Sequence, residues 1–262
     1  MARAAVPRRL TWHVATVAAV KDETASARTL VLDVPGWPGH LAGQHVDVKL
    51  TAEDGYSAQR SYSIASAPDG SRLELTVQRI ADGEVSPYLT EVLAPGDPLE
   101  LRGPIGGWFV WRPDSPAPLL LLAGGSGVVP LMAMIRASTT VPVRLIYSAR
   151  TPADVIYAPE LTERSLVSPL TLTYLYTRSP GSGRNAALSP APDAARDGAG
   201  AVAARSGRID AAVIDGAAFS PDEKPAIFVC GPSGFVEAAA DLLTAAGHPA
   251  ATIKTERFGP TS

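Results

Sequence analysis

The N-terminal part of the chain contains short runs in which apolar and polar positions alternate, as in strands with one buried face. These runs are rich in β-branched residues and are separated by Gly, Pro and Asp, which favour turns. The six runs are WHVATVAAV, RTLVLDV, QHVDVKL, RSYSIAS, RLELTVQRI and DPLELRG. Six such strands predict a closed or nearly closed antiparallel β-barrel. A helix is predicted over 86–93, with Ser86 as N-cap, Pro87 as first helical residue and Pro95-Gly96 as the stop.

Beyond the Pro-rich stretch WRPDSP, strand-like runs alternate with helical segments, and the first of these runs, LLLLA, is fully apolar. The strand-like runs are LLLLA, VRLIYS, LTLTYLYT and AIFVC, and helices are expected at PLMAMIRAS, near 159–164, near 209–215 and at GFVEAAADLLTAAG. This alternation predicts an α/β domain with a doubly wound parallel sheet. We place the barrel in residues 1–113 and the α/β domain in residues 114–262. The segment 179–206 is rich in Ala, Pro, Gly, Ser and Arg without periodicity, which predicts a mobile insertion.

Composition narrows the choice of function. The 262 residues suffice for about two domains, and a net charge of −3 gives no reason to expect nucleic-acid binding. The longest apolar stretch is too short to cross a bilayer, and MARAAVPRRL lacks the apolar core of a signal peptide, so we expect a cytoplasmic protein. One cysteine cannot form a disulfide within the chain or hold an iron–sulfur cluster, and the four histidines lack metal-ligand spacing, so no metal site is expected.

The run RSYS places chemically useful groups on one predicted strand. Because side chains alternate across a strand, Arg60 and Tyr62 share one face, while Ser61 and Ser63 share the other. A guanidinium suits a phosphate, an aromatic ring suits a flat conjugated ring, and a hydroxyl can address a ring nitrogen. The combination fits a flavin nucleotide, although the same pattern alone is as typical of an ordinary exposed strand.

Three further motifs suggest anion sites. The amides of DGEVS, before the predicted helix, offer one that Arg60 would complete, unless Ser86 is merely a helix cap. GGSGVVP joins an apolar strand to a helix and indicates a pyrophosphate cradle, with a tight turn as the alternative, because Pro130 replaces the last glycine of the G-x-G-x-x-G pattern. The strand ending in YSAR has no acid for a ribose 2′-hydroxyl. It offers Ser148 and Arg150 instead, which suit a 2′-phosphate.

Residues after the later strands extend this nucleotide site. Arg178 and Arg208 follow in the chain and would complete a phosphate clamp with Arg150, with solvated loop arginines as the alternative. The run Cys230-Gly231-Pro232 ends a predicted strand at the carboxyl edge of the sheet, where ligands of such folds bind. We favour a site role for it over that of a buried apolar cysteine.

Taken in their order and spacing, the motifs RSYS, GEVS, GPIG, AGGSGVVP, YSAR, CGP and ERFG resemble the ferredoxin–NADP reductase superfamily. The resemblance covers nearly the whole chain except the N-terminal arm and 179–206. It implies a barrel that binds FAD, or less often FMN, and an α/β domain that binds a nicotinamide nucleotide. GPIG is similar to the family's segment that links the barrel to the nucleotide cleft.

For the flavin, the resemblance implies that Arg60 binds phosphate, that Tyr62 stacks on one ring face, and that Ser63 hydrogen-bonds near N(5). The flavin pyrophosphate would be held by Gly83, Val85 and Ser86. Phe258 would cover the opposite ring face and would have to move for the nicotinamide. Ser63 and Glu256 would handle the proton near N(5).

For the nucleotide, the resemblance implies that Gly125 and Gly127 contact the pyrophosphate and that Cys230 sits by the nicotinamide, with Gly231 and Pro232 beside it. The 2′-phosphate would be read by Arg150, Arg178 and Arg208. The segment 179–206 puts Arg208 in doubt and makes Arg184 a competitor.

The resemblance implies hydride transfer from NADPH, favoured over NADH, to FAD. Because one cysteine cannot hold a cluster, the electrons would pass to a separate acceptor: a ferredoxin, a flavodoxin, a haem or molybdenum protein, or free flavin or oxygen. A free-flavin reductase and an FAD-binding electron-transfer subunit that uses no nicotinamide remain alternatives. We expect a monomer.

Overall fold

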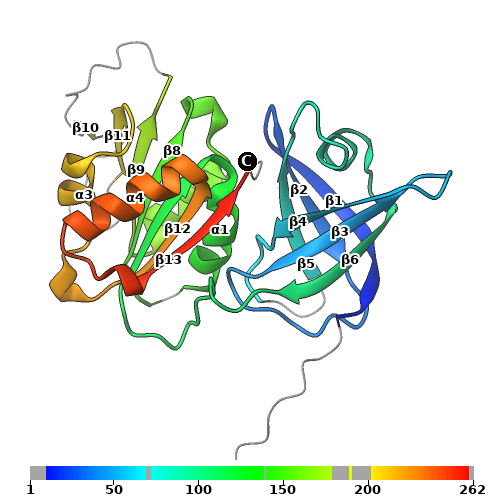
Figure 1. Cartoon of the computed structure of the whole chain (residues 1–262), viewed down its shortest axis with the longest axis horizontal. Coiled ribbons are helices and arrows are strands. Elements are labelled where there is room, and N and C mark those ends of the chain that lie inside the picture. The colour runs from blue at the N-terminus through cyan, green and yellow to red at the C-terminus, as the bar shows by residue number, and fades with distance from the viewer. Residues whose placement is uncertain (1–9, 69–71, 139, 179–188, 191–201, 260–262) are drawn as a thin grey trace, which may run out of the picture.

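The computed structural model describes residues 10–68, 72–138, 140–178, 189–190 and 202–259. Two lobes lie side by side, an N-terminal barrel and a C-terminal sheet flanked by helices (Figure 1). Both match the fold class predicted from the pattern of apolar residues.

The barrel lobe is a six-stranded antiparallel sheet in the order β4-β3-β6-β1-β2-β5. Its strands are β1 (Trp12–Thr24), β2 (Ala27–Asp33), β3 (His45–Thr51), β4 (Ser57–Ser63), β5 (Arg72–Gln78) and β6 (Pro98–Ile105). An isolated bridge between Ile64 and Leu75 joins the end of β4 to β5, the other edge of the sheet. The inward residues of all six strands fill one apolar core, as the predicted barrel requires.

The helix predicted over 86–93 in the barrel lobe is present over residues 86–92. A π-helix, η1, covers Tyr88–Val92, and Leu89 in it is buried in the barrel core. Ser86 is not its N-cap: the Ser86 hydroxyl accepts a hydrogen bond from the Ile80 amide at 3.0 Å and so fixes the preceding loop. A side chain turned back to the loop cannot cap the helix, and the sequence did not reveal that competing donor.

The C-terminal lobe has a seven-stranded sheet in the order β10-β11-β9-β8-β7-β12-β13. Its strands are β7 (Leu119–Gly124), β8 (Val143–Ala149), β9 (Leu170–Tyr176), β10 (Ser189–Pro190), β11 (Val202–Ser206), β12 (Ala226–Pro232) and β13 (Ile253–Phe258). All neighbours pair in parallel except β10 and β11. The central β7 is buried at every position, which explains its continuous apolar run.

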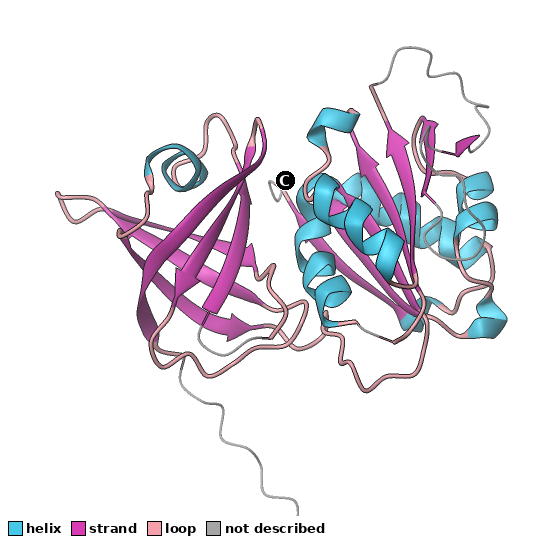
Figure 2. Ribbon diagram, turned by 180° about the vertical axis from the view of Figure 1, so that it is seen from behind, coloured by secondary structure: helices cyan, strands magenta, loops and turns pink. Residues whose placement is uncertain are grey.

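Helices cover both faces of this sheet, as a doubly wound fold requires (Figure 2). The α-helices are α1 (Val128–Ala137), α2 (Ala158–Val167), α3 (Ala211–Ala217) and α4 (Ser233–Ala245), and the 3₁₀-helices are η2 (Gly125–Gly127), η3 (Pro152–Asp154), η4 (Pro221–Glu223) and η5 (Ala250–Thr252). α1 and α2 share one apolar cluster with the sheet, and α3 and α4 share the other. None of the helices in the described part of the chain is long and apolar enough to cross a membrane.

The predicted insertion over 179–206 is wrong at its C-terminal end. Residues Val202–Ser206 form β11, which pairs in parallel with β9 from Val202↔Leu172 to Ser206↔Tyr176. Arg205 in β11 is buried and forms an ion pair with Asp210, the residue that caps α3. The short run of Ala, Arg and Ser lacks strand character by itself, and pairing with β9 decides its conformation. Residues 179–188 and 191–201 lie outside the described residues.

The lobes share a packed interface. The apolar cluster beneath α1 and α2 includes three barrel-side residues, Ala27, Ala42 and Ala65, and two from the connecting segment, Phe109 and Trp111. The Phe109 ring also meets the Phe228 ring of β12 edge-on, with centroids 5.3 Å apart. Because Ala65 lies two residues after β4, these contacts place the end of the RSYS strand beside the lobe that carries GGSG.

Candidate functional site

Strand β4 runs along the barrel edge and ends at the neighbouring lobe (Figure 1). Arg60, Tyr62 and Ser63 lie on it, and their side chains range from exposed to half-buried. Tyr62 packs against the barrel core, and burial raises the pKa of its phenol to about 12, so the ring stays neutral. An apolar ring that is buried on one side and open on the other suits stacking against a flat cofactor ring.

Arg60 has an acidic partner from a distant part of the chain. Its Nη2 lies 2.9 Å from Glu84 Oε2, and the Tyr56 hydroxyl donates to Glu84 Oε1 at 2.9 Å. Arg60, which we expect to bind a flavin phosphate, is therefore paired with a carboxylate. That carboxylate belongs to the GEVS loop, which we also expect to bind phosphate. In the sequence, the Glu of GEVS is the one signal for this ion pair. Because it lies far from Arg60 along the chain, the pairing is not evident from the sequence.

The GEVS loop offers backbone groups more than side chains. Val85 is completely buried in the barrel core and Ser86 is nearly so. Since the Ser86 hydroxyl already accepts from Ile80, and Gly83 donates its amide to the Ile80 carbonyl at 3.0 Å, the loop is a tight turn. Contacts of Val85 to a pyrophosphate would come from its amide, which remains a prediction.

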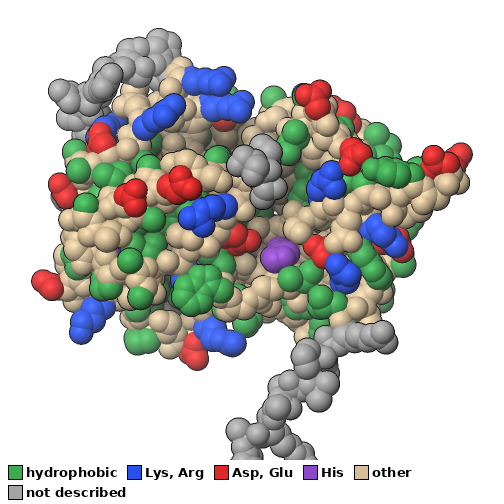
Figure 3. All heavy atoms as spheres, viewed as in Figure 1, with side chains coloured by type: hydrophobic (Ala, Val, Ile, Leu, Met, Phe, Trp, Pro, Cys, Tyr) green, Lys and Arg blue, Asp and Glu red, His purple; other side chains and the backbone are tan. Residues whose placement is uncertain are grey.

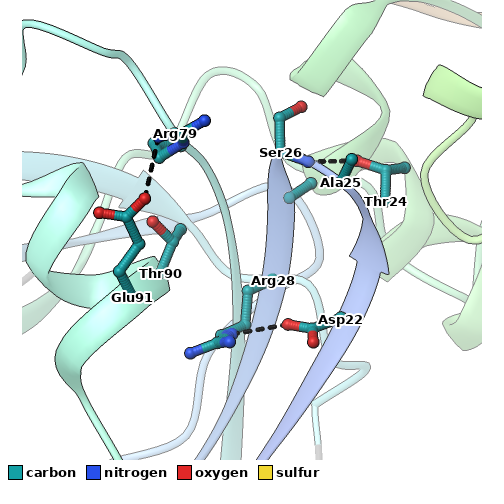
Figure 4. A pocket seen from close by; sticks show the side chains of 9 residues that line it. Asp22, Thr24, Ala25, Ser26, Arg28, Arg79, Thr90 and Glu91 are labelled. Carbon is teal, nitrogen blue, oxygen red and sulfur yellow. Dashed lines mark hydrogen bonds and ion pairs between the residues drawn. The ribbon is translucent and has the colours of Figure 1, made fainter.

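Cavities lie on two sides of η1. One, of about 560 Å³, is lined by Tyr56, Glu84 and Tyr88 and adjoins the Arg60 pair. The other, of about 570 Å³, is lined by Asp22, Arg28, Arg79 and Glu91 among others (Figure 4). In the second cavity, Arg28 pairs with Asp22 at 2.7 Å and Arg79 with Glu91 at 2.9 Å, so its cations are already neutralised.

The GGSG turn has the predicted strand–turn–helix setting, between β7 and α1. A Cβ on Gly127 would lie 2.1 Å from the Cys230 carbonyl oxygen, and one on Gly231 would lie 3.1 Å from Gly124 Cα. Gly125 has φ +55°, which favours glycine. The glycines therefore let β7, η2 and the end of β12 approach backbone to backbone at the N-terminus of α1. This cradle fits a phosphate ligand, because amides at a helix start attract anions.

The three proposed clamp arginines follow three neighbouring strands. Arg150 follows β8, Arg178 follows β9 and Arg208 comes two residues after β11, and all three are exposed. The Arg178 amide donates to the Arg150 carbonyl at 2.9 Å. Within the described residues none of them forms an ion pair, and positive side chains gather at this end of the lobe (Figure 3). Arg184 lies outside the described residues.

Cys230 and Glu256 are neighbours in the parallel register of β12 and β13. Burial raises the pKa of the Glu256 carboxyl to about 7, and its Oε2 is buried without a hydrogen-bond partner in the described part of the chain. Burial, and then the nearby Glu256, raise the pKa of the Cys230 thiol, so the thiol stays protonated. The pair thus places a buried proton and an unsatisfied oxygen beside the glycine cradle.

Phe258 and Pro232 are register neighbours at the ends of β13 and β12. Phe258 is 37% exposed, and β13 ends between the two lobes (Figures 1 and 2). An exposed Phe ring at this place fits the prediction that Phe258 covers one face of a bound flavin. The contact itself stays a prediction.

The chain is similar to two families of domains, one in each lobe. Residues 15–110 match the family described as Oxidoreductase FAD-binding domain, and residues 121–241 match Oxidoreductase NAD-binding domain. The fold and the glycine cradle are consistent with FAD and a pyridine nucleotide as ligands.

Relatives extend this similarity along the chain. Ferredoxin--NADP reductase B of Sorangium cellulosum is 36% identical over 83% of this chain and 84% of its own length. The ferredoxin reductase component of 3-ketosteroid-9-alpha-monooxygenase of Mycolicibacterium smegmatis is 34% identical over 92% of this chain, which spans 64% of that relative. The flavohem-like FAD/NAD binding domain of nitric oxide dioxygenase from Vibrio cholerae superposes with a TM-score of 0.79 at 22% identity, covering 95% of this chain and 99% of that one.

Proposed function

Because this chain belongs to the ferredoxin–NADP reductase superfamily, we propose that it takes hydride from a nicotinamide nucleotide onto FAD and passes electrons to a separate acceptor protein. The observation that carries the proposal is the packed interface between the lobes, in which Ala65 shares one apolar cluster with α1. The RSYS strand of the barrel ends against the lobe whose helix α1 begins at the glycine cradle.

The residues present fit FAD. Arg60 would bind its phosphates after leaving Glu84, the turn amides at Gly83 and Val85 would hold the pyrophosphate, and Tyr62 would support the ring. Bound FAD supplies the ability to accept two electrons as hydride and release them singly.

Other residues would exclude water from the flavin ring and hold a proton near it. Tyr62 and Phe258 would exclude water from the two sides of the ring. Glu256, whose pKa is raised to about 7 by burial, can hold or release a proton near neutral pH, and Ser63 offers a hydroxyl at the end of β4. A carboxyl whose pKa lies near the working pH suits proton transfer.

The nucleotide would lie over the cradle of Gly125 and Gly127, with Cys230 as an apolar wall beside the nicotinamide. We further propose NADPH as the preferred donor, because Arg150, Arg178 and Arg208 follow adjacent strands and no acid follows β8 directly. A guanidinium attracts a 2′-phosphate, whereas an acid there would favour the free 2′-hydroxyl.

The acceptor is proposed from the printed names of the relatives. A ferredoxin reductase component of a monooxygenase and a ferredoxin--NADP reductase are among the similar proteins, so an iron–sulfur protein is the favoured partner. The described residues contain no group of three or more His, Cys, Asp or Glu side chains arranged to hold a metal ion.

The test is anaerobic stopped-flow mixing of the FAD-loaded protein with NADPH or NADH, followed by absorbance. We expect the flavin band to bleach with both and at lower concentrations with NADPH. Addition of oxidised ferredoxin should then restore the band. A protein that stays colourless after FAD is added, or a band that neither nucleotide bleaches, would contradict the proposal.

A further inference from the structure

Arg136 lies in the last turn of α1 and reaches out of its own lobe. Its Nη1 donates to the Ala65 carbonyl at 3.0 Å and to Glu74 Oε2 at 2.6 Å, and both partners belong to the barrel lobe. Ala65 comes two residues after Ser63, the end of the RSYS strand, and its own amide donates to the Glu74 carbonyl at 2.7 Å. The barrel partners of Arg136 are therefore fixed to each other.

The other side of the same guanidinium is held inside the α/β lobe. Nε and Nη2 donate to the two oxygens of Glu160 in α2, at 2.9 and 2.5 Å. The guanidinium also lies 5.1 Å from the centroid of the Tyr157 ring. A two-pronged contact of this kind fixes orientation as well as distance.

Arg136 is buried and permanently charged. Its side chain is 13% exposed, and although burial alone would lower its pKa, Glu160 and Glu74 hold the pKa above its usual value. Water cannot replace the carboxylates around a cation this buried, so Arg136 requires both Glu74 and Glu160 to stay in place.

Tyr157 makes a second link across the interface. It is fully buried, and its hydroxyl donates to Thr76 Oγ1 of β5, which lies 2.7 Å from Thr29 Oγ1 of β2. Tyr157 has φ +63°, a conformation that non-glycine residues rarely adopt. Such backbone persists where surrounding contacts hold it, and here the contacts come from the opposite lobe and from Arg136.

We propose that Arg136 is a positioning residue that couples helix α1 to the RSYS strand and so sets the relative orientation of the nucleotide and flavin sites. This role rests on the proposed function, because it requires that both sites take part in one transfer. α1 has 10 residues, which makes it about 15 Å long. One end starts at the glycine cradle and the other carries Arg136, so a tilt at Arg136 is transmitted to the cradle.

The kinetic test compares Arg136→Gln and Arg136→Lys with Arg164→Gln. Arg164 also contacts Glu160, at 2.8 Å, but stays within α2, so it is a matched control. We expect Arg136→Gln to slow flavin bleaching at saturating NADPH about tenfold or more, with the dissociation constants of FAD and NADPH changed less than threefold. Arg136→Lys should recover part of the rate, because an ammonium keeps the charge but not the fork. Arg164→Gln should bleach at the unmodified rate.

A second test reads orientation without any transfer. Cys230 is buried, so spin labels can be placed on Val92→Cys in the barrel lobe and Leu166→Cys in α2, both exposed positions. In the protein without nucleotide, we expect a single narrow distance distribution between the labels. Arg136→Gln, and Glu74→Gln as a second variant, should broaden or shift it, while Arg164→Gln should not.

The two tests separate the possible failures. If Arg136→Gln only lowers the melting temperature, leaving bleaching at saturation and the label distribution unchanged, Arg136 is purely structural and the proposal is wrong. If the unmodified protein shows no bleaching while Arg136→Gln alters the label distribution, the proposed function fails but the coupling of the lobes stands.

Discussion

The guanidinium of Arg60 and the carboxylate of Glu84 form an ion pair at 2.9 Å, at the place where the flavin phosphates are proposed to bind. Both side chains are about half exposed, so water screens the pair and the cost of opening it is small. A phosphate that binds Arg60 must displace Glu84 or share the guanidinium with it. Glu84 therefore acts against the cofactor that its own loop is proposed to hold.

Replacing Glu84 with Gln should tighten FAD binding about two- to fivefold, because an exposed ion pair contributes about 0.2–1 kcal/mol. Arg60→Ala should weaken FAD binding about tenfold or more, since a charge-assisted hydrogen bond contributes about 1.5–3 kcal/mol. Fluorescence titration of the cofactor-free protein with FAD measures both. Glu91→Gln, which opens the similar Arg79 pair on the other side of η1, serves as the control and should leave affinity unchanged. Weaker binding by Glu84→Gln would show that the carboxylate supports the cofactor.

Replacing Arg150 with Ala should raise the Michaelis constant for NADPH roughly 10- to 150-fold and leave that for NADH nearly unchanged. The reason is the loss of a charge-assisted contact to the 2′-phosphate, which contributes about 1.5–3 kcal/mol. Steady-state assays with both nucleotides measure the difference, and raising the salt concentration should shrink it. Equal effects on the two nucleotides would mean that Arg150 does not read the 2′-phosphate.

Gly127→Ala should lower the free energy of unfolding by more than about 2 kcal/mol, because its Cβ would lie 2.1 Å from the Cys230 carbonyl oxygen and backbone must move. Gly234→Ala is the matched control: nothing lies within 4 Å of its added Cβ, and it sits in α4. Alanine there should be neutral or stabilising by about 0.5–1 kcal/mol. Urea unfolding measures both, and equal stabilities would refute the close approach.

Glu256 should make stability depend on pH. Its pKa is raised from about 4.5 to about 7 in the folded protein, so the folded state binds the proton more tightly than the unfolded chain. Its stabilisation is complete below pH 4.5, falls as pH rises and is lost above about pH 7, a change on the order of 3 kcal/mol.

The measurement is the free energy of unfolding at pH 5 and pH 8 for the unmodified protein and Glu256→Gln. The loss of unfolding free energy from pH 5 to pH 8 should be smaller for the glutamine variant, because an amide does not titrate in this range. The histidines affect both proteins alike, so the comparison isolates Glu256. Identical pH profiles would mean that the carboxyl ionises normally in the folded state.

The fold class and the order of the motifs follow from the amino-acid pattern alone. Alternating apolar positions encode the barrel strands, and the continuous run of β7 encodes a buried parallel strand, because these patterns depend on local backbone geometry. The glycines around Gly127 indicate that backbone segments approach closely where the chain turns from β7 into α1. The candidate residues at strand ends follow from the same logic, since parallel strands bring their carboxyl ends to one edge.

Which distant groups meet depends on how the folded chain packs. β11 is a strand because β9 offers its edge, Glu84 meets Arg60 from the loop that follows β5, and burial between neighbouring strands raises the pKa of Glu256. In the sequence, Arg136 is an ordinary basic residue at a helix end. Its hydrogen bonds to Ala65 and Glu74 exist only because the barrel packs against α1. The physical reason is that burial and pairing energies depend on three-dimensional neighbours, which a local pattern of residue types does not contain.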